Sequence, residues 1–112
     1  MAQDFERTLQ QNISNNSGSP TTLRAAADSD DAIIGIRCTN ISGSSVDVTV
    51  YVENSSNDYH IIKSAPIPTG GSLELIDGGS KVVLQSGDAV KAYASAASSV
   101  DIITSVVDAI ST

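Results

Sequence analysis

The sequence predicts an all-β fold, a single antiparallel β-sandwich of the jelly-roll or immunoglobulin-like type with about eight strands. Three observations predict it. Apolar and polar residues alternate in several short runs, turn residues separate those runs, and 112 residues are enough for one modest core. We assign residues 20–112 to the sandwich and residues 1–19 to an N-terminal arm and hinge.

The run SVDVTVYVE, residues 45–53, carries the strongest strand signal. Four alternate positions are valine and the positions between them are mostly polar, which is typical of a strand with one buried and one wet face. The buried set is Val46, Val48, Val50 and Val52, and the wet set is Asp47, Thr49, Tyr51 and Glu53.

The remaining strands are predicted at residues 21–27, 32–41, 59–63, 72–76, 81–85, 89–95 and 100–107. In residues 32–41 the alternation places Ile34, Ile36 and Cys38 together, with Ile33 on the opposite face. Prolines on either side of Ile67 indicate an edge strand or a crossover, with Ile67 filling the core. A helix over residues 88–100 is the alternative there because alanine favours helix.

The N-terminal arm is predicted to be extended or a short helix. Phe5, Leu9 and Ile13 recur at a spacing of four, which gives one apolar stripe on a helix. The following SNNSGSP run is predicted to be a hinge. The three side chains are our candidate partner-binding residues, and the stripe either covers the domain's own sheet edge or is buried against a neighbouring subunit.

Charge and hydropathy exclude several classes of partner. A net charge of −7 and a pI near 4.2 disfavour both nucleic acid and an anionic membrane surface. No apolar run approaches the length that spans a bilayer, and the N-terminus has no signal-peptide pattern. We therefore expect the protein to be made in the cytoplasm. One cysteine rules out an intrachain disulfide.

The inventory of catalytic side chains is small. Cys38 and His60 are the only thiol and imidazole, and each lies within a predicted strand. Cys38 fits a small core residue and His60 a surface or edge side chain. An enzyme is therefore not expected, and no cofactor is predicted.

Two sets of residues are candidates for a binding site. Asp28, Asp30 and Asp31 place three hard oxygen ligands in one turn, but without the glycine and distal glutamate of an EF-hand a solvated turn is favoured over a calcium site. Tyr51, Tyr59 and Tyr93 are candidates for a carbohydrate-stacking platform in a host-adhesion module.

Four stretches within residues 33–107 have a telling order and spacing: I-R-C-T-N-I-S from Ile36, Y-H-I-I-K-S-A-P-I-P-T-G-G from Tyr59, K-V-V-L-Q-S-G-D from Lys81 and V-D-I-I-T-S from Val100. On these stretches, residues 33–107 resemble small β-sandwich structural proteins in the virions of tailed bacteriophages, especially marine and cyanobacterial ones.

This resemblance implies a non-enzymatic virion protein. It is expected to be a capsid decoration (cement) protein that binds the major capsid protein, or else a tail, neck or fibre-adaptor subunit that binds other virion proteins. Such proteins are usually oligomeric, and a trimer suits the three-fold positions of a shell. No catalytic residue carries over.

Overall fold

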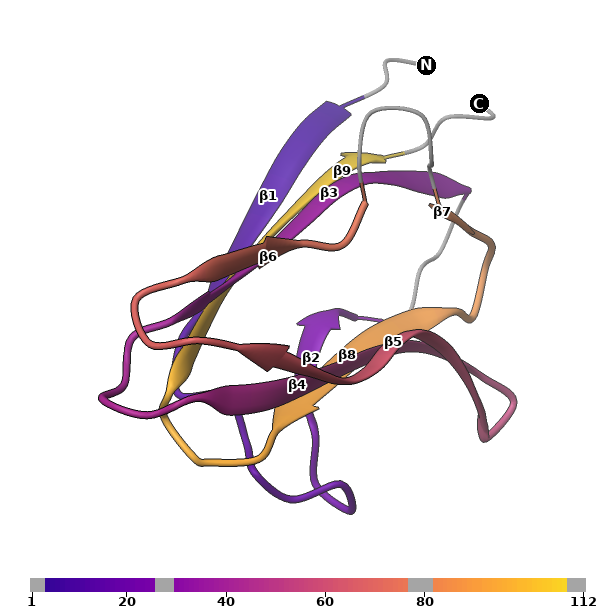
Figure 1. Ribbon diagram of the computed structural model, residues 1–112. Coiled ribbons are helices and arrows are strands. Elements are labelled where there is room, and N and C mark those ends of the chain that lie inside the picture. Colours follow the sequence, from indigo (N-terminus) through magenta and orange to yellow (C-terminus); the bar gives the residue numbers. More distant parts are fainter. Residues whose placement is uncertain (1–3, 26–29, 77–81, 109–112) are drawn as a thin grey trace.

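The computed structural model describes residues 4–25, 30–76 and 82–108, and these form nine strands in two facing antiparallel sheets (Figure 1). The predicted all-β sandwich is confirmed. The described residues contain no helix, so the helical form of the arm and the helical alternative at residues 88–100 are both wrong. Accordingly, no described segment is a helix long and apolar enough to cross a membrane.

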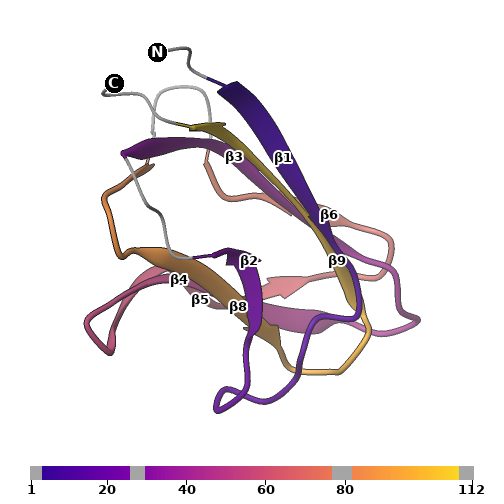
Figure 2. The same ribbon diagram turned by 180° about the vertical axis from the view of Figure 1, so that it is seen from behind.

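The first sheet has the order β1-β9-β3-β6, and β7 also pairs with β3. Its strands are β1 (Asp4–Gln10), β3 (Asp31–Asn40), β6 (Ser72–Glu74), β7 (Val82–Leu84) and β9 (Val100–Asp108). The N-terminal and C-terminal strands are therefore neighbours, and Figure 2 shows β1 running along the edge of this sheet beside β9.

The second sheet has the order β2-β8-β4-β5. Its strands are β2 (Thr21–Arg24), β4 (Val46–Asn54), β5 (Asn57–Ile67) and β8 (Ala89–Ala94). β5 is an edge strand and holds Pro66, as the missing proline N–H predicts. Ile67 is 1% exposed and fills the core, which confirms its predicted role.

The core between the sheets is aliphatic. The second sheet contributes Val46, Val48 and Val50, which pack against residues such as Ile36 and Ile102 of the first. No aromatic side chain belongs to this cluster among the described residues. The small Val, Ile, Leu and Ala core that the composition indicates is present.

A β-bulge in β3 changes the predicted facing of its isoleucines. The register of β3 against β9 shifts between Ile33 and Gly35, so alternation is interrupted there. Ile33 and Ile36 are both fully buried, whereas Ile34 is partly exposed. Simple alternation placed Ile34 with Ile36 and was wrong at this point because it allows for no inserted residue.

The predicted wet face of β4 is partly buried. Thr49 and Tyr51 are 2% and 3% exposed. The Thr49 hydroxyl accepts a hydrogen bond from the Ser64 backbone N–H at 3.0 Å, and the Tyr51 ring lies 5.5 Å from that of His60 and 6.4 Å from that of Tyr93. Side chains from neighbouring strands therefore shield these positions.

The N-terminal segment belongs to the sandwich and does not protrude as a separate arm. All seven residues of β1 are paired with β9, from Asp4 opposite Asp108 to Gln10 opposite Ile102. A spacing of four places Phe5 and Leu9 on one face of a strand as well as of a helix, which is why the apolar pattern did not distinguish the two. Ile13, beyond the end of β1, is completely buried.

Candidate partner-binding surface

An apolar pair lies on the face of the first sheet that points away from the core. Leu9 of β1 is directly opposite Ile103 of β9, and the two side chains are 58% and 44% exposed. Neighbours of Ile103 along the strand, Ile102 and Thr104, point inward and are buried, so Ile103 points outward. Directly opposite residues of antiparallel strands share a face, which places Leu9 beside it.

A second apolar row crosses the same face. Phe5 of β1 is opposite Val107 of β9, Val107 is opposite Ala32 of β3, and Ala32 is opposite Val83 of β7. The two ends of this row are exposed, Phe5 by 78% and Val83 by 55%. We call the exposed side chains Phe5, Leu9, Val83 and Ile103 the apolar patch.

Polar side chains separate and border the residues of the apolar patch. Arg7 lies between Phe5 and Leu9 on β1 and is exposed. Arg37 and Glu74 form an ion pair at 3.1 Å with their side chains 60% and 40% exposed. The face therefore has two apolar rows with Arg7 and Ser105 between them and a charged pair beside the second row, and apolar and charged side chains occur together in protein-binding surfaces.

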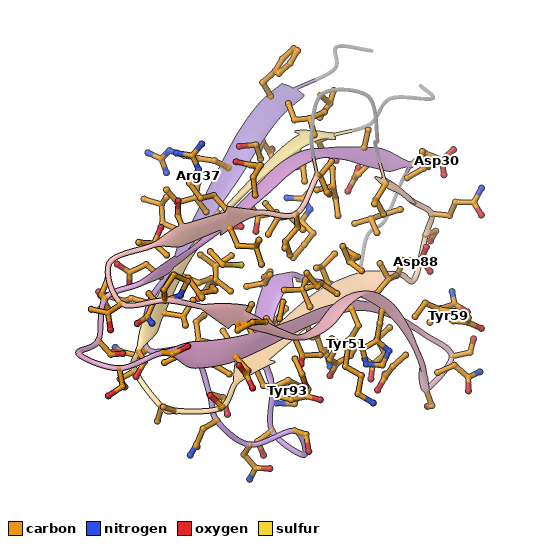
Figure 3. All side chains as sticks on the ribbon, viewed as in Figure 1. Asp30, Arg37, Tyr51, Tyr59, Asp88 and Tyr93 are labelled. Atoms are coloured by element: carbon orange, nitrogen blue, oxygen red, sulfur yellow. The ribbon has the colours of Figure 1, made fainter. Side chains whose placement is uncertain are left out.

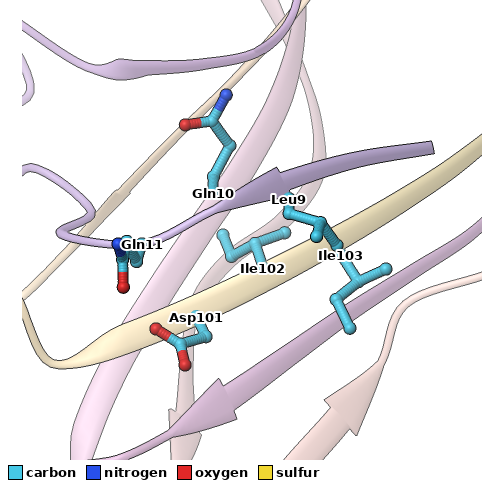
Figure 4. A pocket seen from close by; sticks show the side chains of 6 residues that line it. All are labelled: Leu9, Gln10, Gln11, Asp101, Ile102 and Ile103. Carbon is cyan, nitrogen blue, oxygen red and sulfur yellow. The ribbon is translucent and has the colours of Figure 1, made fainter.

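The outer face is hollowed on both sides of Ile103. One hollow, of about 350 Å³, is lined by Leu9, Gln10, Gln11, Asp101, Ile102 and Ile103 (Figure 4). The other, of about 260 Å³, is lined by Gly35, Arg37, Glu74, Ile103 and Ser105. Ile103 therefore stands as a ridge between two shallow depressions that a partner's side chains can enter.

The first of these hollows contains an unusual carboxylate. The Oδ1 atom of Asp101 is inaccessible to solvent and has no hydrogen-bond partner among the described residues. A buried oxygen without a hydrogen-bond partner costs free energy.

The structure separates the three predicted partner-binding residues. Phe5 and Leu9 are on the apolar patch, whereas Ile13 is part of the chain's own core and is not available to a partner. Ile103 of β9 is also on the patch but is not among the residues predicted from the sequence. An isoleucine on the outward face of an otherwise alternating strand was the available signal.

An ion-pair cluster lies between the two sheets near the start of β1. Arg24 of β2 contacts Glu6 at 3.0 Å, Asp31 at 3.1 Å and Asp108 at 3.4 Å. Burial lowers the pKa of the Arg24 guanidinium, but hydrogen bonds to Glu6 and Asp31 outweigh it and the net pKa is raised. A hydrogen bond with Asp31, together with desolvation and like charge, raises the pKa of Asp108.

The structure describes only part of the predicted acidic turn. Asp28 lies outside the described residues. Asp31 is 1% exposed and is paired with Arg24. Among residues 4–25, 30–76 and 82–108, no group of three or more His, Cys, Asp or Glu side chains is arranged to hold a metal ion.

The three tyrosines do not share one face. Tyr51 and Tyr93 meet on the outer face of the second sheet, but Tyr51 is almost inaccessible. Tyr59 is 58% exposed and lies opposite Val52, apart from the other two (Figure 3). Tyr93 borders a polar hollow of about 200 Å³ that includes Asn15 and Asp47. A flat exposed platform of stacked tyrosines is therefore not formed.

Cys38 and His60 lie on different sheets and do not form a dyad. Cys38 is in the core, where desolvation, assisted by the charge of Glu74, raises the pKa of its thiol to about 12. His60 is exposed and stacks against Tyr51 on the far side of the second sheet. The predicted core position of Cys38 and surface position of His60 are confirmed.

Comparisons with known proteins show the fold alone. No protein-family model and no curated protein sequence matches the chain. A solved structure of Bacillus endospore appendages, described as a novel family of disulfide-linked pili, is similar with a TM-score of 0.54 and 13% identity, over 98% of this chain and 88% of that chain. This likeness extends along nearly the whole sandwich.

Two further structures overlap less well. Hydroxypropylphosphonic acid epoxidase from S. wedmorenis has a TM-score of 0.42 and 10% identity, over 92% of this chain and 42% of that one. A structure of infectious bursal disease virus Gx strain has a TM-score of 0.32 and 11% identity, over 93% and 41%. Neither likeness is close enough to bear on function.

Proposed function

We propose that this chain is a non-enzymatic structural protein of a virion, most directly a capsid decoration protein that binds and stabilises the assembled shell. The observation that carries the proposal is the apolar patch, with Phe5 78% exposed and Leu9 58% exposed on an otherwise polar, acidic molecule. Large apolar side chains gathered on one sheet face indicate a protein-binding surface. The resemblance of residues 33–107 to small phage virion sandwiches supplies the class of partner.

The energetics suit a repeated assembly. Burying the four partly exposed side chains of the apolar patch contributes roughly a few kcal/mol, which is weak for a single complex. On a shell, many copies bind at once. Because each copy binds the assembled shell and not the free subunits, binding shifts the equilibrium toward the shell by mass action. Modest affinity per copy is therefore sufficient.

The chemistry of the described side chains supports a binding role over catalysis. The thiol of Cys38 is buried and protonated at neutral pH, since its pKa is raised to about 12. A nucleophile needs the opposite shift and access to substrate. His60 is exposed, and its ring contacts that of Tyr51.

The proposal is tested by sedimentation of the purified protein with shells stripped of it. The Leu9→Ser variant is expected to lose most of its co-sedimentation. Ile41→Ser is the matched control, because Ile41 is also 58% exposed but follows β3 outside the patch. Equal loss for both variants, or binding to isolated capsid monomers as strong as to shells, would contradict a patch-mediated decoration role.

Copy number separates the shell from the tail. A decoration protein is present in many more copies per particle than a tail, neck or fibre-adaptor subunit. Quantitative mass spectrometry of virions measures the copies of this protein relative to the major capsid protein. We expect the many copies of a shell protein, and a few copies per particle would place the protein in the tail or neck.

A further inference from the structure

β1 is attached to the sandwich on one side only. It is the edge of the first sheet and pairs with β9 and no other strand in the described part of the chain. None of its side chains belongs to the hydrophobic core, which begins in sequence at Ile13. The seven-residue ladder with β9 therefore holds β1 in place with little help from apolar burial.

The contacts beneath β1 are polar. The Thr8 hydroxyl donates to the Leu23 carbonyl at 2.9 Å, and Glu6 pairs with Arg24 at 3.0 Å. The Thr104 hydroxyl, which lies on β9 opposite Thr8, is buried without a hydrogen-bond partner among the described residues. Polar contacts of this kind exchange with water at small net cost, so the side chains of Glu6 and Thr8 add little to the attachment of β1.

The chain is firmly anchored just after β1. The Ser98 backbone N–H donates to the Ile13 carbonyl at 3.2 Å, and the Ala94 N–H donates to the Ser14 carbonyl at 2.8 Å. The Ser14 N–H donates to the Thr21 hydroxyl at 2.9 Å. Only Gln11 and Asn12 separate the end of β1 from this anchor, so the hinge of β1 is these two residues and precedes the SNNSGSP run, where the sequence predicted it.

Asn12 adopts a left-handed backbone conformation with φ of 56°. This region is unfavourable for residues with a side chain, although asparagine tolerates it better than most. An extended hinge relieves this cost. The turn that returns β1 to its own β9 is therefore the strained part of the attachment.

We propose that β1 is an exchangeable strand, which leaves its own β9 and pairs with the β9 of a second copy of this chain. The second copy is the fitting occupant because its β1 reproduces every contact of the original, including Leu9 with Ile103 and Glu6 with Arg24. Such exchange costs only the difference in hinge conformation and the entropy of association. It is favoured wherever copies are concentrated, as on a repeated lattice.

This inference stands apart from the proposed function. Strand exchange is a property of the chain with itself and needs no shell, so it is tested with purified protein. In the exchanged dimer, Phe5 and Leu9 of one copy would lie beside Ile103 of the other, so each apolar patch would contain residues of both copies.

The test uses one cysteine on each side of the β1–β9 ladder. Single variants Leu9→Cys and Ile103→Cys are mixed, unfolded together in denaturant, refolded at high concentration and mildly oxidised. Both positions are exposed, so neither variant is expected to misfold. Opposed residues of antiparallel strands have Cα atoms about 4.5–5.5 Å apart, within the range that a disulfide spans. Cys38 is buried and does not compete.

The expected result is a covalent heterodimer on a non-reducing gel, about tenfold more abundant than in a mixture of Leu9→Cys with Val83→Cys. Val83 is 55% exposed on the same face but pairs with β3 and not β1, so it reports random collision. Equal heterodimer yields in the two mixtures would overturn strand exchange. The Leu9→Cys/Ile103→Cys double variant, refolded in parallel, gives a second test. If it forms the disulfide only within one chain, strand exchange is also overturned.

The hinge supplies a second, independent readout. Asn12→Gly relieves the left-handed turn and is expected to lower the heterodimer yield, whereas Asn12→Pro fixes φ near −65° and is expected to raise it. Both are built into the Leu9→Cys and Ile103→Cys backgrounds. The same yield for glycine, asparagine and proline at this position would mean that the hinge does not control β1.

Discussion

Leu9 stands directly opposite Ile103 across the outermost ladder of the first sheet, and both side chains remain exposed. An edge strand normally places its apolar residues inward against the core. β1 does the reverse, because its inward side chains Glu6 and Thr8 make polar contacts with β2. The free energy of apolar burial at Phe5 and Leu9 is therefore still available to a partner.

Phe5 and Ile67 are expected to respond oppositely to truncation. Phe5→Ala should change the free energy of unfolding by less than about 0.5 kcal/mol, because the ring is exposed. Ile67→Ala should cost about 3 kcal/mol, since Ile67 is 1% exposed and a cavity remains. Urea unfolding of the two variants measures the difference, and a large loss for Phe5→Ala would show that its ring packs on the sandwich.

Arg24→Met is expected to destabilise the fold by about 3 kcal/mol, because it removes the guanidinium that pairs with the buried Asp31 carboxylate. Arg37→Met is the matched control. It removes the solvent-exposed pair with Glu74 and should change stability by less than about 1 kcal/mol. Equal effects in chemical denaturation would mean that the Arg24 cluster contributes no more than a surface ion pair.

Asp108→Asn is expected to raise the melting temperature at pH 7. The pKa of Asp108 is raised above its ordinary value of 3.8, first by its hydrogen bond with Asp31 and then by desolvation and like charge. The folded state thus holds this proton more tightly than the unfolded state. The associated stability is fully present below pH 3.8 and is lost as pH rises through the folded-state pKa.

An asparagine at position 108 keeps a hydrogen-bond donor for Asp31 and removes one of the repelling charges. The gain in melting temperature should therefore shrink as the pH approaches 3, where Asp108 is already protonated. Calorimetry at several pH values provides the measurement. A destabilised variant at pH 7 would show that attraction to Arg24 outweighs the repulsion.

The Cys38 thiol is expected to resist alkylation in the folded protein and to react on unfolding. Desolvation raises its pKa to about 12, so the thiolate is scarce at pH 8. The ordinary thiol value is 9.0, so this group's contribution to stability is complete below pH 9 and is lost as pH rises toward 12. Leu9→Cys is the exposed control, and its added thiol should react at once. Rapid labelling of native Cys38 would contradict a closed core.

The eight strands predicted from alternation are all present, and the ninth is the N-terminal segment. Alternation identifies a strand when one face is apolar and buried, as in Val46 to Val52. β1 has its apolar face outward and its polar face inward, so its sequence resembles a short amphipathic helix as much as a strand. Its pairing with β9 depends on a contact nearly a hundred residues away, roughly the longest separation that a domain of this size allows.

The candidate surface was only partly predictable. Phe5 and Leu9 were selected because they are the apolar residues of a segment rich in polar ones. Ile13 has the same spacing but lies beyond the turn at Asn12, where the chain enters the core. Ile103 and Val83 join the patch through strand order, which no local pattern in the sequence specifies.

The most direct test of the virion role is a cryo-electron microscopy map of the particle that carries this protein. We expect one ordered β-sandwich per binding site on the shell, with Phe5, Leu9 and Ile103 buried against a capsid subunit or a neighbouring copy. A map that places the protein on the shell with this face open to solvent, or that shows no copy on the shell, would contradict the account.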